Sequence, residues 1–111
     1  MRLDDILETV SGYASDADLD IVIRAYFYAA RAHDKQRRKS GEAYFTHPLA
    51  VAAILAELKM DVDTLATALL HDTLEDTFVT AEEIEQNFGA EVLDLVQGVT
   101  KISKLEFRSK E

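Results

Sequence analysis

The chain of 111 residues contains no cysteine and no tryptophan, and it has only one proline and four glycines. Without cysteine, neither disulfide bonds nor thiolate metal ligands are available. No apolar run approaches the roughly 20 residues that a bilayer span requires, and residues 1–13 carry acids where a secretion signal would be apolar. These absences predict a soluble, cytoplasmic protein that does not cross a membrane.

Basic residues are also missing from a long part of the chain. Between Met60 and Thr100 there are ten Asp or Glu residues and no Lys or Arg. The formal net charge of −9 argues against direct nucleic-acid binding, because a phosphate backbone requires a basic face. Five of the twelve basic residues instead lie within nine positions, at Arg31, Lys35, Arg37, Arg38 and Lys39. An acidic, metal-binding part beside this cluster suits a small, multiply phosphorylated ligand, although a solvated basic loop has the same composition.

Apolar residues recur with helical periodicity, and no segment alternates apolar and polar residues for the length of a strand. The sequence therefore predicts an all-α bundle of about six helices with short connections. The expected helices cover residues 2–10, 15 to about 36, 47 to about 60, 61 to about 77, 80–88, and 90 onward. Residues 37–45 have lost the period and are expected to form a loop.

Local signals place the helix ends. Ser15 or Asp16 is expected to cap the second helix, and Asp61 or Asp63 the fourth. His47 precedes the only proline and is expected to cap the third helix, because the residue before proline avoids helical geometry. Further signals are a capping box of Thr80 with Glu83 and a C-terminal stop at Gly89.

Periodicity also predicts the buried stripe of each longer helix. The expected stripes are Leu19, Val22, Ile23, Tyr26, Phe27 and Ala30 in the second helix; Val51, Ile54, Leu55 and Leu58 in the third; and Val92, Leu95, Val96, Val99 and Ile102 in the last.

The segment LLHDTLED, residues 69–76, concentrates one imidazole and three carboxylates in a largely apolar stretch. On a continuous helix, His71 and Glu75 stack one turn apart, and so do Asp72 and Asp76. Like charges at that spacing repel each other, and a carboxylate near a core needs a partner. A bound cation explains the cluster. A helix end with solvated acids and a capping histidine explains it equally well.

Three separated motifs, RRKSGEAYFTHP, HDTLED and VTKIS, occur in this order. Together they closely resemble the N-terminal hydrolase domain of the RelA/SpoT family, long bacterial enzymes that make and degrade the alarmones ppGpp and pppGpp. The resemblance extends from about Leu19 to Leu105. It implies an HD-domain-like helical bundle and a metal-dependent phosphohydrolase.

The resemblance also implies which residues hold the metal. His47, His71 and Asp72 match ligands of one divalent ion, usually Mn²⁺, and mixed imidazole and carboxylate ligands suit such ions. Glu75 and Asp76 match the acidic pair that places or activates the attacking water. The alternatives are a metal-free cap for His47 and solvated acids for the pair. The fourth ligand of the family, an aspartate in a stretch like LADRLHNM, lies beyond residue 111.

Substrate-binding residues follow from the same resemblance. Arg38 matches an arginine that faces the nucleotide phosphates and the catalytic centre, and Lys39 matches a residue on the guanine or ribose side. Ser40 lies in the turn beside them, although an ordinary surface loop would have the same sequence. Thr100 and Lys101 belong to the VTKIS segment and are expected to line the nucleotide pocket, or else to form a helix terminus without a ligand.

Two further positions complete the comparison. His33 is interpreted as structural, because no carboxylate motif is arranged around it. Ala43 replaces a common proline of the family and removes no functional group.

The resemblance implies the N-terminal part of a larger stringent-response enzyme that hydrolyses ppGpp and pppGpp. Its synthetase and regulatory domains would lie on the same parent chain, and whether the parent also makes alarmone stays open. The 111 residues alone are expected to be inactive, and exposed apolar surface is expected to favour a homodimer or helix exchange. The alternative functions are a non-catalytic HD regulatory or interaction module of a (p)ppGpp synthetase and an HD phosphohydrolase for another nucleotide.

Overall fold

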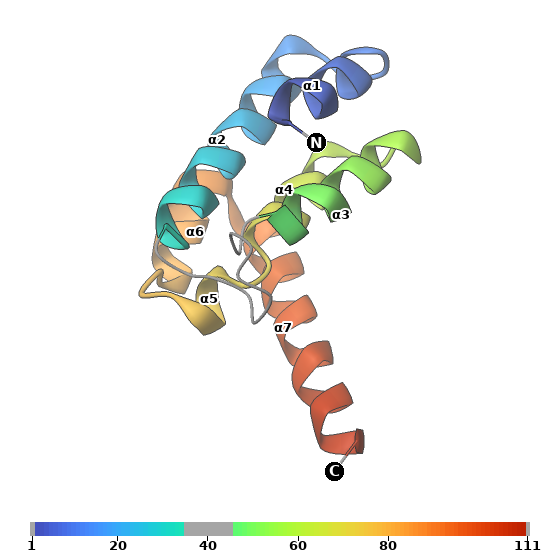
Figure 1. Cartoon of the computed structure of the whole chain (residues 1–111). Coiled ribbons are helices and arrows are strands. Elements are labelled where there is room, and N and C mark those ends of the chain that lie inside the picture. The colour runs from blue at the N-terminus through green and yellow to red at the C-terminus, as the bar shows by residue number, and fades with distance from the viewer. Residues whose placement is uncertain (1, 35–45, 111) are drawn as a thin grey trace.

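A computed structural model describes residues 2–34 and 46–110, with side chains described in 2–34 and 48–102. Within these residues all regular structure is helical (Figure 1), which confirms the all-α fold class. The helices are α1 (Leu3–Ser11), α2 (Asp16–Ala32), α3 (Thr46–Glu57), α4 (Val62–Leu70), α5 (Thr73–Asp76), α6 (Ala81–Phe88) and α7 (Ala90–Lys110). The expected fourth helix is divided into α4 and α5, and the other five correspond one to one.

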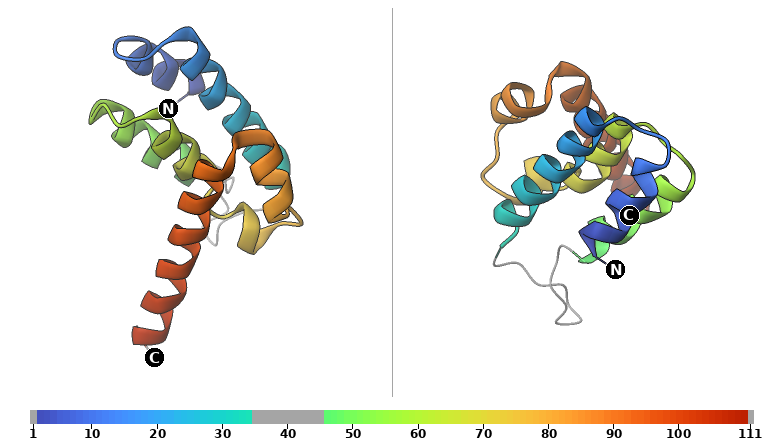
Figure 2. Two further views of the ribbon diagram at one scale, coloured as in Figure 1. Left: turned by 180° about the vertical axis from the view of Figure 1, so that it is seen from behind. Right: turned by 90° about the horizontal axis from the view of Figure 1, so that it is seen from above.

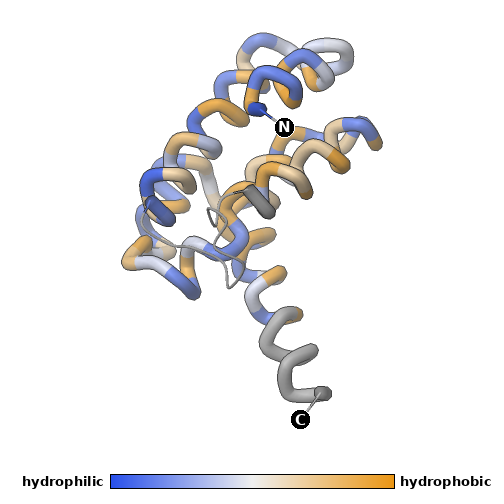
Figure 3. Tube along the Cα trace, in the orientation of Figure 1, coloured by the Kyte–Doolittle hydropathy of each residue, from blue (hydrophilic) through white to orange (hydrophobic). Residues whose placement is uncertain are grey.

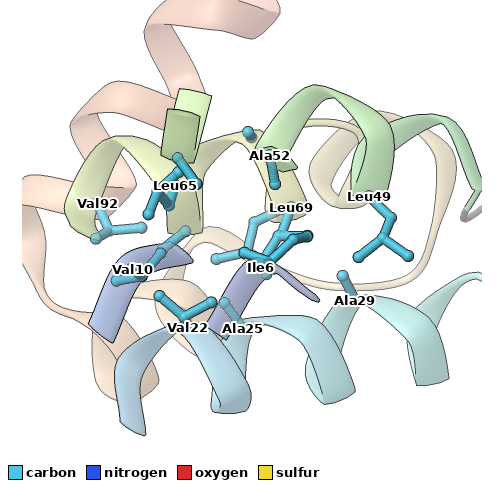
Figure 4. Packing of buried hydrophobic residues seen from close by; sticks show 14 of the residues in the cluster. Ile6, Val10, Val22, Ala25, Ala29, Leu49, Ala52, Leu65, Leu69 and Val92 are labelled. Carbon is cyan, nitrogen blue, oxygen red and sulfur yellow. The ribbon is translucent and has the colours of Figure 1, made fainter. Parts of the chain in front are cut away.

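Helix α4 is the centre of the bundle. Its residues from Leu65 to Leu70 are all buried, and it packs against α2, α3 and α7. In the view of Figure 4, Leu65 and Leu69 lie next to Ile6 and Val10 of α1 and near Ala52 of α3, with the α2 side chains Val22, Ala25 and Ala29 on the other side of Ile6 and Val10. A helix that is apolar on all sides is stable only when other helices surround it. The sequence of α4 therefore requires this central place.

The buried faces of α2, α3 and α7 differ from the predicted stripes. In α3 the buried residues include Ala52, Ala53 and Ala56, whereas Ile54 and Leu58 are 59% and 63% exposed. The structure likewise buries Val22, Ala25 and Ala29 in α2 and leaves Phe27 exposed, and in α7 it buries Val92 and Val96 but not Leu95 or Ile102. The predicted stripes were thus confirmed at Val22, Val92 and Val96 and wrong at the exposed positions. They failed there because α2 and α3 carry apolar residues on more than one face, and alanines allow closer helix packing. Figure 3 shows that most of the α3 trace is coloured as hydrophobic.

The caps agree with the sequence. Ser15 accepts a hydrogen bond from the Asp18 amide at 3.2 Å, and Asp61 accepts one from the Thr64 amide at 2.9 Å. Thr80 accepts from the Glu83 amide at 3.2 Å. Gly89 ends α6 with φ 93°, a conformation that favours glycine. Each cap satisfies a backbone group that its helix leaves without a partner.

Two helix boundaries were predicted incorrectly. Helix α2 ends at Ala32, before the expected limit near residue 36. Helix α3 begins at Thr46, so His47 lies within its first turn and does not cap it. The side chain of His47 is outside the described part, as are residues 35–45 with the predicted loop.

Helix α7 is the longest element and extends well beyond the other helices (Figures 1 and 2). Its N-terminal part packs against α4 and α6, and it also contacts α5. Gly98 does not interrupt it. In the described residues no helix combines the length and apolarity that a membrane crossing needs.

Replacing Asp61 with alanine should lower the free energy of unfolding by about 1 kcal/mol, because the N-cap of α4 loses its acceptor. Hydrogen bonds from Thr64 lower the pKa of Asp61. Its stabilisation is therefore complete above the unfolded pKa of about 3.9 and is lost as pH falls through the lower folded pKa. Urea unfolding from neutral to acidic pH measures both effects.

Asp61→Asn is the control for this prediction. Asparagine caps helices well but does not titrate, so stability at neutral pH should be retained while this pH dependence disappears. Equal stability of the alanine variant and the original chain would contradict the capping role.

Candidate metal centre

His71 and Asp72 form a turn between α4 and α5, although their backbone angles remain in the right-handed helical region. The ring Nδ1 of His71 lies 2.6 Å from the carbonyl oxygen of Ala68, and the Thr73 hydroxyl donates to the carbonyl of Leu70 at 2.7 Å. Two carbonyl oxygens at the end of α4 therefore accept hydrogen bonds from side chains, and the helix ends there. The prediction of one continuous helix through residue 77 was wrong for this reason.

The same contact fixes the protonation of the imidazole. A carbonyl oxygen can only accept, so Nδ1 of His71 carries the hydrogen and Nε2 points elsewhere. Nε2 lies 3.2 Å from Oδ2 of Asp72, and the two side chains are 20% and 23% exposed. Two acceptor atoms this close need a positive charge between them. Either a proton or a metal ion supplies it.

The His71–Asp72 spacing fits adjacent positions on one metal ion. Donor atoms bound at about 2.1 Å and at right angles lie about 3 Å apart, close to the 3.2 Å observed. The hydrogen bond from Nδ1 to a backbone carbonyl is the usual support for a metal-binding histidine. Among residues whose side chains are described, no group of three or more potential ligands occurs. The role predicted for His47 therefore stays a prediction.

Electrostatics at Asp72 disfavour its charged form. Burial raises the pKa of Asp72, as do the negative charges of Asp76 and Glu75, while His33 lowers it. A carboxylate in this state gains more from a bound cation than an exposed one does. The neighbouring acids therefore increase the benefit of a positive ion at Asp72.

The acidic pair lies close to Asp72. Glu75 and Asp76 are exposed on α5, and the Asp76 amide donates to the Asp72 carbonyl at 3.0 Å. Asp72 and Asp76 thus remain one helical turn apart, although α4 and α5 are separate helices. The acids remain on the solvent side of the centre, where a water molecule or a ligand can reach them.

The other predicted residues are more distant in the sequence. Thr100 and Lys101 lie within α7, not at its terminus, and the Thr100 hydroxyl donates to the Val96 carbonyl at 3.0 Å. Lys101 is exposed. Arg38, Lys39 and Ser40 lie outside the described residues.

Comparison with known proteins identifies the family. Residues 25–111 match the family model described as HD domain. A GTP pyrophosphokinase of Myxococcus xanthus is 58% identical over 96 residues, which cover 86% of this chain and 13% of that protein. The bifunctional (p)ppGpp synthase/hydrolase SpoT of Escherichia coli K12 is 48% identical over 104 residues, 94% of this chain and 15% of that protein. The chain belongs to the RelA/SpoT family of HD-domain proteins.

A solved structure supports the same assignment. It comes from work reporting that a metazoan ortholog of SpoT hydrolyses ppGpp, and it is 35% identical with a TM-score of 0.68. The match covers 78% of this chain and 49% of that one. The HD domain described here therefore spans about half of that structure and 13–15% of the length of the bacterial relatives.

Sequence reasoning did not connect two residues with the centre of this HD domain. His33 is buried at the end of α2 and is close enough to Asp72 to influence its pKa. Thr73 is also fully buried, and its hydroxyl helps to end α4. A threonine just after HD in an apolar stretch was a signal for that turn. Only packing brings His33 to the site, because it is far from Asp72 in the sequence.

Asp72→Asn should raise the melting temperature of the metal-free chain and abolish its stabilisation by Mn²⁺. Because the folded pKa of Asp72 is raised, its ionisation costs stability as pH rises from about 3.9 through the folded value, and the cost is complete above it. Asparagine removes this charge, and its amide can donate to Nε2 of His71. Thermal melts at neutral pH with and without Mn²⁺ measure both effects.

Asp94→Asn provides a matched control, because Asp94 is an exposed carboxylate on α7. It should change neither the metal-free melting temperature nor the response to Mn²⁺. A lower melting temperature for Asp72→Asn, or an undiminished shift with Mn²⁺, would contradict the assignment of Asp72 as a ligand.

Proposed function

We propose that this chain is the N-terminal part, residues 1–111, of an HD hydrolase domain that removes the 3′-pyrophosphate of ppGpp and pppGpp. The products are GDP or GTP and pyrophosphate. The observation that carries the proposal is the pair of His71 and Asp72, held 3.2 Å apart at the end of the central helix. Similarity to SpoT of E. coli and to a ppGpp-hydrolysing metazoan ortholog supports the substrate class.

His71 and Asp72, together with His47, would hold a divalent ion, with Mn²⁺ the first candidate and other divalent ions possible. Such an ion supplies Lewis acidity to the phosphoryl oxygens and to water. The Nδ1 contact of His71 with Ala68 keeps Nε2 directed towards Asp72. The turn after α4 would thus orient both proposed ligands before any substrate arrives, which would reduce the ordering that binding requires.

Glu75 and Asp76 would handle the proton of the attacking water. In the reaction, the water oxygen forms a bond to the phosphorus next to the 3′ oxygen of the ribose, and the bond between that phosphorus and the 3′ oxygen breaks. The proton leaves the water for one of these carboxylates, and the 3′ oxygen receives a proton as it departs. Their exposure on α5, one turn after the ligands, suits this role.

The basic cluster would bind the phosphorylated nucleotide. We assign Arg38 to its phosphates and Lys39 to its guanine or ribose side, with Ser40 in the turn beside them. Thr100 and Lys101 are assigned to the lining of the nucleotide pocket. Arginine suits bidentate phosphate contacts. The support is the sequence cluster itself and the acidic composition of the rest of the chain.

The parent protein is proposed to be a long cytoplasmic stringent-response enzyme, with synthetase and regulatory domains on the same chain. The relatives named above are about seven times longer than this HD domain, which spans 13–15% of them. The 111 residues alone are expected to bind metal weakly and to show almost no activity. The resemblance assigns a further aspartate ligand to a segment that they do not include.

The central test uses the full-length parent. Release of pyrophosphate from ppGpp should require Mn²⁺ or a related ion and should be abolished by Asp72→Ala. Asp94→Ala serves as the control and should retain full activity. Release that needs no divalent ion, or unchanged release by the Asp72 variant, would defeat the assignment. A panel of other nucleotides tested in parallel separates an alarmone hydrolase from an HD phosphohydrolase with a different substrate.

The alternative, a non-catalytic HD regulatory module of a (p)ppGpp synthetase, makes a different prediction. It expects no metal uptake by the parent and no effect of changing His47 or His71 on thermal stability with Mn²⁺ present. Metal analysis of the purified parent therefore separates the two functions even when the substrate is not known.

Glu75→Gln and Asp76→Asn should separate chemistry from metal binding in the parent. Loss of the general base should lower kcat about 10²–10⁴-fold, whereas bound metal should remain stoichiometric because neither acid is a proposed ligand. Steady-state hydrolysis and metal content are measured on the same preparations. Full activity of both single variants and of the double variant would exclude a base role for this pair.

A further inference from the structure

A hollow of about 900 Å³ lies on the side of the molecule formed by α2 and α6. Aromatic and aliphatic side chains line it, among them Phe27, Tyr28, Val79 and Phe88. Phe27 is 61% exposed, although it is one of the largest apolar side chains of α2. We call this hollow the α2–α6 groove. Its lining includes no proposed metal ligand and no residue assigned individually to the nucleotide, although Arg31 also belongs to the basic cluster of the sequence.

The α2–α6 groove is preformed by contacts between its two helices. The Tyr28 hydroxyl donates to Glu83 at 2.7 Å, and the Tyr28 and Phe88 rings meet edge to face at 5.5 Å. Arg24 donates to the carbonyl of Asn87, and its guanidinium lies 5.4 Å from the centre of the Phe88 ring. Burial and Glu83 raise the pKa of Tyr28 to about 12, so the hydroxyl remains a donor throughout the physiological range. An occupant would thus meet walls that are already ordered.

Helix α2 has more apolar surface than the core uses. Val22, Ala25 and Ala29 face the core, whereas Ile23 and Phe27 follow the other side and line the α2–α6 groove. This second apolar face explains why periodicity placed Ile23 and Phe27 in the buried stripe of α2 together with Val22, which is buried. The exposed ring of Phe27 is available for contact with a binding partner.

A projecting side chain stands directly beside the groove. Phe78 is 102% exposed, so the fold gives it no cover at all. It immediately precedes Val79, which lines the groove, in the segment that joins α5 to α6. We call the exposed Phe78 side chain the knob. It lies next to the α2–α6 groove, which is the hollow into which such a side chain could insert.

We propose that the α2–α6 groove binds a second copy of this chain, with Phe78 of each copy inserted into the groove of the other. A two-fold symmetric interface needs one patch that is complementary to itself. A knob adjacent to a hollow of matching chemistry satisfies that requirement, because one rotation places both knobs in both hollows. The proposal is independent of the alarmone hydrolase activity.

Charges around the patch favour this occupant. Arg24 and Arg31 line the groove, and Arg31 has no ion pair among the described residues. The groove lining also contains Asp34 and Glu83, and Glu83 accepts from Tyr28. On the Phe78 side, the first turn of α6 carries Glu82, which is exposed and outside the lining. In a symmetric pair, the acidic surroundings of each knob approach the arginines of the opposite groove. This complementarity steers association and weakens with salt.

The expected affinity is low. A stable interface buries about 800 Å² on each partner, which is about a tenth of the 7214 Å² surface of this chain. One phenylalanine contributes about 150–250 Å² when it is buried. Burial of Phe78 therefore supplies only part of the area of a stable interface, so we expect a weak dimer whose population depends on concentration.

Sedimentation velocity of the 111-residue chain over a concentration series tests the proposal. Phe78→Ala should weaken the dimer by at least about tenfold, because every dimer loses both knobs. Because Phe78 has no cover in the monomer, the substitution should leave the thermal stability of the monomer unchanged. Leu58→Ala is the matched control, since Leu58, the residue after α3, is 63% exposed, and it should leave the dimer intact.

Fluorescence supplies a direct readout of the knob. The chain contains no tryptophan, so Phe78→Trp introduces a single emitter and keeps an aromatic side chain. Its emission should shift to the blue as concentration rises, and Arg31→Glu in the same chain should move that shift to higher concentration. Leu58→Trp should emit at the wavelength of exposed tryptophan at all concentrations.

Three outcomes would overturn the proposal. The first is a chain that stays monomeric throughout the concentration series. The second is a dimer that Phe78→Ala leaves intact but Leu58→Ala disrupts, which would assign the interface to the apolar surface of α3. The third is a Phe78→Trp emission that shifts only when the other domains of the parent are present, which would make an intramolecular segment the occupant of the groove.

Discussion

The candidate centre depends on one constraint: the Nδ1 hydrogen of His71 is committed to the carbonyl of Ala68. This contact turns Nε2 towards the Asp72 carboxylate and leaves two acceptors 3.2 Å apart. A proton or a metal ion must lie between them. The Thr73 hydroxyl, bonded to the Leu70 carbonyl, reinforces the same turn. The contacts that end α4 thus also place the side chains of His71 and Asp72.

The surrounding bundle makes the end of α4 rigid, and it also makes the charged form of Asp72 unfavourable. Helix α4 is enclosed by α2, α3 and α7, so its C-terminal end cannot move without repacking the core. That rigidity holds the donor atoms, but burial and nearby acids also raise the pKa of Asp72. The charged form of Asp72 is therefore unfavourable in the metal-free domain. The carboxylate that lowers stability is also the one that we propose as a metal ligand.

Much of the architecture was predictable from local chemistry. The caps at Ser15, Asp61 and Thr80 and the stop at Gly89 were read correctly, because each depends on the bonds of one side chain or on the φ of one glycine. The site was predicted less completely. The motif HDTLED identified the three acids and one imidazole. It predicted neither the turn that separates α4 from α5 nor the proximity of buried His33 to Asp72.

The sequence by itself determined the helical class, the helix order and the concentration of acids after a buried helix, because periodicity and capping act over a few residues. Only the tertiary structure decided which apolar face each helix buries. Helices α2 and α3 offer more than one such face, and close packing selected the one lined by small alanines such as Ala25 and Ala52. That selection left Phe27 exposed beside α6, since a residue pattern along one helix contains no information about the neighbour that will cover it.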